Sequence, residues 1–125
     1  WQPNAQRYAA GGVNTLGLTA LASSLSLIEE IGIDVIAEHG STLALLATQG
    51  LRRKAGVHVV SSTDPAHRSA LVVFTRSNPA RDAELVQELA AQGIVVALRP
   101  LGARLSVHFY NTEADVARLL DALPD

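Results

Sequence analysis

Hydrophobic positions along the chain predict an opening helix that is apolar on two sides. From Asn14 to Ile31, apolar residues recur at spacings of three and four, which is the helical period. The two stripes consist of Leu18, Leu21, Leu25 and Ile28, and of Leu16, Ala20, Leu27 and Ile31. Gly32 then supplies the helix stop. A helix with two apolar faces requires partners on both.

A second helix is predicted from Asp34, as its N-cap, to about Lys54. Its apolar members are Val35, Ile36, Leu43, Leu46, Ala47 and Leu51. Gly40 and Gly50 interrupt this pattern, and each weakens a helix by about 1 kcal/mol relative to alanine. We therefore expect close packing or a break at these glycines. The basic residues 52–54 are placed on the last turn, where the helix dipole favours cations.

The rest of the chain alternates between strand and helix patterns. Strands are predicted at residues 57–61, 70–75, 94–98 and 104–109. The second of these is apolar throughout, which is typical of a strand covered on both faces. A helix opens at Asn78-Pro79 and ends at Gly93, and a last helix opens at Thr112 with the pattern of a capping box.

This order of elements predicts an α+β fold. The elements form a two-layer sandwich, in which a small sheet of about four strands carries helices on one face and is preceded by the long apolar helix. Residues 1–13 lack a sustained period and are expected to be an extended lead-in. Residues 14–125 are expected to form a single small domain, because 125 residues of which 48% are hydrophobic suffice for one core.

Composition removes several classes of function. The net charge of −2 is scattered, which argues against a nucleic-acid or polybasic membrane surface. The chain has no cysteine, and its four histidines are spread over separate elements, so no metal site is predicted. Without a long apolar run, we expect a soluble, cytoplasmic protein. Because the chain holds no methionine and begins with Trp1, we also expect that it was cleaved or truncated from a longer polypeptide.

The fourth predicted strand carries the candidate chemistry. Alternation places Leu105, Val107 and Phe109 on the core face, and Arg104, Ser106, His108 and Tyr110 on the opposite face. Arg99 precedes the turn before this strand, so the hairpin could bring two guanidinium groups to one end of the sheet. Because a guanidinium binds a carboxylate through two parallel hydrogen bonds, this arrangement favours an anionic small molecule. The alternative is a solvated polar face with surface ion pairs.

Two groups of motifs resemble a known family. The first consists of Arg7-Tyr8, Gly11, Asn14 and Ile31-Gly32, and the second of the segments Gly93–Arg99 and Arg104–Glu113. In this order they resemble the C-terminal part of class V aminotransferases. That branch of the fold-type I pyridoxal-phosphate enzymes includes cysteine desulfurases, selenocysteine lyases and isopenicillin-epimerase-like proteins. The resemblance implies a small C-terminal domain that accompanies a large cofactor-binding domain in a homodimer.

The resemblance also implies roles for individual residues. Arg104 matches the arginine that anchors the substrate α-carboxylate, and Arg99 and His108 match supporting positions. The segment that contains Gly11, Gly12 and Asn14 is expected near the phosphate of pyridoxal 5'-phosphate, usually that of the partner subunit. Gly12 stands where the family has a threonine, so a hydroxyl donor to that phosphate is missing.

The family's Schiff-base lysine belongs to the large domain, and Lys54, at a helix end, does not match it. Since the chain has no cysteine, persulfide chemistry on this domain is disfavoured. We therefore expect no catalytic residue in this chain, no cofactor bound by it alone, and pyridoxal 5'-phosphate in the intact enzyme. The expected function is that of the C-terminal substrate-carboxylate-binding domain of an enzyme acting on an amino acid, inactive without its large domain. Transamination, racemisation and lyase chemistry all stay open.

Two alternatives from other classes of function stay open. One is a free-standing small-molecule-binding or regulatory domain that binds a carboxylate through Arg99 and Arg104 without catalysis. The other is a dimerisation module without a ligand, in which the loss of the Arg104 side chain would change no binding.

Overall fold

The computed structural model describes residues 3–8 and 11–124, and the chain divides into two compact units, Trp1–Ile33 and Asp34–Asp125. Residues 1, 2, 9, 10 and 125 lie outside the described part, so the predicted lead-in is described only in part.

The first unit holds a short 3-10 helix, η1 (Ala5–Tyr8), and the long helix α1 (Thr15–Ile31). The side chain of Asn14 caps α1, because its Oδ1 accepts a hydrogen bond of 2.9 Å from the backbone N–H of Gly17. At the other end the N–H of Gly32 donates to the carbonyl of Ile28. The predicted helix is thus confirmed. All residues of α1 are described, and none of them is buried.

The second unit is built on a four-stranded antiparallel sheet with the strand order β1-β2-β4-β3. The strands are β1 (Val57–Val59), β2 (Leu71–Arg76), β3 (Ala97–Arg99) and β4 (Gly102–Ser106). A two-residue turn joins β3 to β4, since Arg99 pairs with Gly102. Only glycine fits at position 102, because its φ is +133° and a β-carbon there would overlap the carbonyl oxygen of Phe74.

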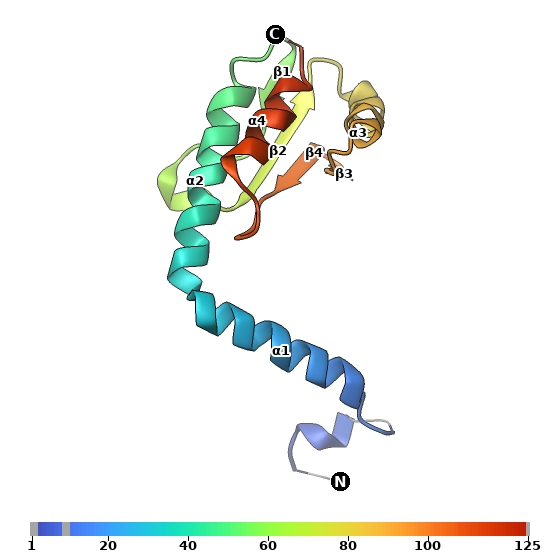
Figure 1. Ribbon diagram of the computed structural model, residues 1–125. Helices are drawn as coiled ribbons and strands as arrows, with labels where there is room; N and C mark the ends of the chain where they lie inside the picture. Colours follow the sequence, from blue (N-terminus) through green and yellow to red (C-terminus); the bar gives the residue numbers. More distant parts are fainter. Residues whose placement is uncertain (1–2, 9–10, 125) are drawn as a thin grey trace. The chain divides into compact units, whose positions relative to one another are not determined.

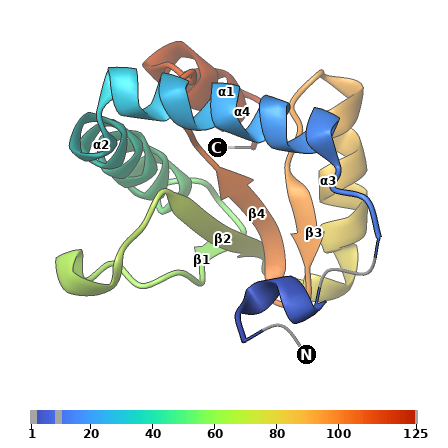
Figure 2. The same ribbon diagram turned by 90° about the horizontal axis from the view of Figure 1, so that it is seen from below.

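Three helices complete this unit: α2 (Ile33–Leu51), α3 (Asp82–Ala91) and α4 (Glu113–Asp121). The short 3-10 helices η2 (Pro65–His67) and η3 (Pro79–Arg81) lie in the connections. Figures 1 and 2 show α2 and α4 side by side across the sheet and α3 beside β3 and β4. A full capping box opens α4, with Thr112 and Asp115 exchanging side-chain to backbone hydrogen bonds.

One face of the sheet forms the core with these helices. Val72 and Phe74 of β2 and Ala103 of β4 are buried, whereas the residues between them along the strands are not. The helices contribute buried residues to the same cluster, among them Leu43, Leu51, Leu85, Leu89, Val116 and Leu119. The predicted α+β fold, with about four strands and helices packed on one face, is confirmed.

The close packing expected at the glycines of α2 is also present. A β-carbon at Gly50 would overlap the side chain of Leu120 on α4, and one at Gly40 would lie 3.0 Å from the β-carbon of Ala70. Both glycines therefore let neighbouring segments approach the helix more closely than alanine would.

Several predicted boundaries are wrong. Helix α2 begins at Ile33, so Asp34 lies in its first turn instead of capping it, and it ends at Leu51, so the basic residues 52–54 follow the helix. Strand β2 is covered on one face only, because Leu71 is 45% exposed while Val72 is buried. Strand β3 starts at Ala97 instead of residue 94.

The fourth strand ends at Ser106 instead of Phe109. A turn closed by Asn111 replaces its predicted second half: the N–H of Asn111 donates to the carbonyl of His108, and the N–H of His108 donates to Oδ1 of Asn111. The asparagine side chain thereby competes with the sheet for the backbone. Only Arg104 and Ser106 of the predicted polar row lie on the strand.

Candidate carboxylate-binding site

Arg104 lines a cavity of about 260 Å³ within the second unit. The cavity is bounded by Ala44 and Thr48 of α2, by residues 71–73 of β2 and by the loop of residues 61–69. Arg104 reaches it from β4, where the strand register places its backbone opposite Val73. The described residues that line the cavity include no carboxylate.

The guanidinium of Arg104 has no partner among the described residues. Its Nε is buried and makes no hydrogen bond to any of them. A buried N–H without an acceptor costs about 1–3 kcal/mol, so this arrangement does not serve the stability of the fold. The acceptor oxygens of an anion in the cavity would satisfy the group.

Three serines of the loop add donors to the cavity. Ser61, Ser62 and Ser69 each accept a backbone N–H, from Val73 at 2.8 Å and from Asp64 and Leu71 at 3.2 Å. These bonds hold the hydroxyl oxygens in place and leave each hydroxyl proton for donation. A set of arginine and hydroxyl donors without a carboxylate suits an anion.

The same cavity holds a second guanidinium, that of Arg68, which is half-buried. The neighbouring His67 also lines it, but its Nδ1 is paired with Oδ2 of Asp64 at 2.9 Å. The N–H of Ala66, followed by His67, lowers the pKa of Asp64 below its ordinary value. Both carboxylate oxygens of Asp64 are therefore hydrogen-bonded to residues of the same loop.

The other two predicted substrate-binding residues lie outside the lining of this cavity. Arg99 shares a sheet face with Arg104, because it pairs with Gly102 two residues earlier on β4, but it is exposed. His108 lies in the turn that follows β4, where its ring stacks on Tyr110 at a centroid distance of 5.1 Å. The structure thus brings Arg104 together with Arg68 instead of with His108.

Helix α2 holds the turn that follows β4. Nε2 of His39 donates a hydrogen bond of 2.9 Å to the carbonyl oxygen of Asn111, 72 residues away. Sequence reasoning missed both His39 and Arg68. A single histidine in a helix and a single arginine in a polar linker carry no periodic signal, and only the tertiary fold shows their neighbours.

The residues expected near the cofactor phosphate belong to the first unit. Gly11 has a φ of +111°, and a β-carbon at Gly11 or Gly12 would meet no described atom within 4 Å. The side-chain oxygen of Asn14 is taken up by the cap of α1. A phosphate role for these residues stays a prediction.

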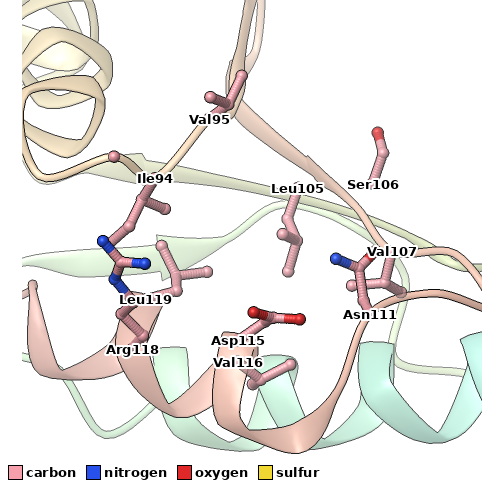
Figure 3. Close-up of a pocket in the computed structure, with 11 residues that line it drawn as sticks. Ile94, Val95, Leu105, Ser106, Val107, Asn111, Asp115, Val116, Arg118 and Leu119 are labelled. Atoms are coloured by element: carbon pink, nitrogen blue, oxygen red, sulfur yellow. The ribbon is translucent and has the colours of Figure 1, made fainter.

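A second cavity, of about 250 Å³, is lined by α4, by the end of β4 and by the segment of residues 93–95. In Figure 3 the side chains of Asp115 and Asn111 point into it among apolar neighbours. The Asp115 carboxylate accepts the N–H of Thr112, Asn111 holds the turn, and Arg118 donates to the carbonyl of Gln92 at 2.6 Å. These polar groups thus serve the fold, and we do not assign this cavity a ligand.

The described residues contain no group of three or more His, Asp or Glu side chains placed to hold a metal ion. Over the same residues, none of the helices combines the length and the apolar character needed to cross a bilayer.

A family model described as "Aminotransferase class-V" matches residues 1–119. The chain belongs to the class V aminotransferase family. The resemblance seen in the motifs is therefore confirmed, and the family depends on pyridoxal phosphate.

Two known proteins show how much of a family member is present. The uncharacterized aminotransferase YcbU of Bacillus subtilis is 25% identical over 119 residues, which cover 95% of this chain and 31% of YcbU. The crystal structure of the cysteine desulfurase CsdA (S-sulfonic acid) from Escherichia coli has 25% identity and a TM-score of 0.84, covering 97% of this chain and 32% of CsdA. The chain spans about a third of the length of both proteins.

The described residues do not fit a complete pyridoxal-phosphate site. The sequence has a single lysine, Lys54, which lies in the turn after α2 and does not line the Arg104 cavity. The cavity therefore offers donors for a carboxylate but no amine for a Schiff base.

Proposed function

We propose that this chain is the C-terminal domain that binds the substrate carboxylate in a class V aminotransferase-like enzyme acting on an amino acid. The observation that carries the proposal is the Arg104 guanidinium, whose buried Nε has no acceptor in a cavity lined by hydroxyl donors and no acid. A carboxylate would accept two parallel hydrogen bonds from its planar fork. Arg99 and His108 would support this site from its surroundings.

In this proposal residues 1–13 are a lead-in and residues 14–125 are one small domain. A large domain, outside this chain, supplies the lysine and holds the cofactor, so the chain alone is inactive. Its coverage of about a third of YcbU and CsdA supports this division. The enzyme is a cytoplasmic homodimer, and Gly11, Gly12 and Asn14 lie near the cofactor phosphate of the partner subunit.

The test is Arg104→Ala in the intact enzyme. Loss of a charge-assisted pair costs about 1.5–3 kcal/mol, so the dissociation constant of the amino-acid substrate should rise about tenfold or more. Titration of the binding equilibrium measures this constant, with Arg53→Ala as the matched control, because Arg53 is exposed and outside the cavity. Arg104→Lys keeps the charge without the planar fork and should recover affinity only in part. An unchanged affinity in Arg104→Ala would refute the assigned role.

A second candidate function is a carboxylate-binding domain without catalysis. It is favoured by the fact that every residue lining the Arg104 cavity belongs to the Asp34–Asp125 unit. If this function is correct, the polypeptide that contains the chain binds carboxylates through Arg104 but carries no lysine that forms a Schiff base. Absorption of bound pyridoxal phosphate, before and after borohydride reduction, separates the two functions.

A further inference from the structure

We propose that Arg68 binds a second anionic group in the Arg104 cavity, so that the ligand is a small dianion, namely an amino acid with an acidic side chain. This inference rests on the proposed function, because it assigns the α-carboxylate to Arg104. Beyond the proposed function, it names the class of substrate that Arg68 would select.

Two positively charged side chains share this cavity. Arg104 and Arg68 line one cavity of about 260 Å³, and neither makes a hydrogen bond or a close ion pair with any described residue. Two positive charges in one partly enclosed space repel each other. One carboxylate would leave the second guanidinium without a partner, whereas two linked carboxylates would satisfy both.

The acid of this loop, Asp64, makes no hydrogen bond with Arg68. Asp64 caps η2, with Oδ1 accepting from the N–H of Ala66 at 2.9 Å and Oδ2 paired with His67. Asp64 and Arg68 attract each other through space, but both carboxylate oxygens are already engaged. Arg68 follows η2 in an extended conformation, with a φ of −83° and a ψ of 155°. Its guanidinium therefore retains its donors for a ligand.

The size of the cavity and its hydroxyl groups favour a small polar ligand. Pockets for drug-sized ligands occupy about 300–1,000 Å³, so a cavity of about 260 Å³ suits a smaller molecule. The hydroxyls of Ser61, Ser62 and Ser69 in the lining can each donate a hydrogen bond, besides the backbone N–H that each accepts. These donors suit a short dicarboxylate better than an apolar side chain.

The experiment measures binding by calorimetry with unreactive probes, using the intact polypeptide that contains this chain. The probes are glutarate and succinate as dicarboxylates and butyrate as the monocarboxylate. We expect the wild type to bind the better dicarboxylate at least tenfold more tightly than butyrate. Arg68→Gln should abolish this preference and leave butyrate affinity within twofold of the wild type. Arg68→Lys, which keeps the charge without the fork, should retain part of the preference.

Arg53→Gln is the matched control, because it removes the same charge from an exposed position outside the cavity. It should preserve the dicarboxylate preference, and thermal unfolding should show that each variant is folded. A wild type without the preference, or an Arg68→Gln variant that keeps it, would overturn the inference. The role of Arg104 would still stand if Arg104→Ala weakened butyrate binding. If Arg104→Ala left both probes unaffected, the proposed function and this inference would fail together.

Discussion

The two long helices of this chain are both rich in apolar residues, but their environments are opposite. Helix α1 has 17 residues and α2 has 19, and Gly32 separates them. Six residues of α2 are buried, and none of α1 is. Leu16 of α1 is 82% exposed, whereas Leu43 of α2 is 1% exposed. Apolar periodicity therefore predicts a helix and the faces that require cover, but not whether this chain supplies the cover.

The contrast separates two kinds of candidate residue. Arg104 and Arg68 lie in the unit that has its own core, and α2 contributes Ala44 and Thr48 to their cavity. Gly11, Gly12 and Asn14 lie in the unit whose long helix has no buried residue. The residues of the candidate carboxylate site all lie in one unit, whereas a phosphate role for residues 11–14 stays a prediction.

The largest expected difference between the two units is in the cost of truncating an apolar side chain. Phe74 is fully buried in the sheet, so Phe74→Ala should lower the free energy of unfolding of the chain by about 3–5 kcal/mol. Leu21 is 53% exposed on α1, so Leu21→Ala should lower the free energy of unfolding by less than about 0.5 kcal/mol. Urea unfolding of this chain, followed by circular dichroism, measures both.

Equal costs for Phe74→Ala and Leu21→Ala in this chain would contradict the contrast between the units. A stricter test of the contrast makes the same two substitutions in the intact polypeptide. There a covered α1 should raise the cost of Leu21→Ala to about 2–5 kcal/mol, while the cost of Phe74→Ala should change little.

The next effect concerns the hairpin that carries Arg104. Gly102→Ala should cost about 1–3 kcal/mol from the backbone conformation alone, and the overlap with the Phe74 carbonyl adds to it. Gly56→Ala is the control, since Gly56 also has a positive φ, of +68°, but its β-carbon would lie 3.7 Å from the nearest atom. Thermal unfolding should show a clearly larger loss for Gly102→Ala. A loss no larger than that of Gly56→Ala would show that the hairpin can move away from β2.

Much of the fold was predictable because its signals are local. Asn14 caps α1, Thr112 and Asp115 form the capping box, and Gly50 marks a close approach, as their types and positions indicate. The end of β4 was not predictable from alternation. The alternation through Phe109 continues the pattern of a strand, but the N–H of His108 donates a hydrogen bond to the side chain of Asn111 and not to a neighbouring strand.

The candidate site was predictable only in its first residue. Arg104 stands in a motif that resembles the family and on a strand with clear alternation. Arg68 lies 36 positions earlier in a polar linker, and it reaches the same cavity because β2 pairs with β4, with Leu71 opposite Ser106. Strand register is a property of the whole sheet, so no local pattern in the linker indicates this neighbour.

The smallest expected effect compares the two helix caps as the pH falls. The N–H of Thr112 lowers the pKa of Asp115 in the capping box of α4, whereas the amide of Asn14 at α1 does not titrate. Because the pKa of Asp115 is lower in the folded state, its contribution to stability is present above the unfolded value, near 3.9, and is lost as the pH falls through the folded value. Asp115→Asn should therefore be less stable than the wild type at pH 6, and the gap should close below about pH 4. Asn14→Ala should differ from the wild type by the same amount at both pH values. Urea unfolding of the three proteins at each pH measures these gaps, and a gap for Asp115→Asn that persists at low pH would show that the carboxylate charge does not stabilise α4.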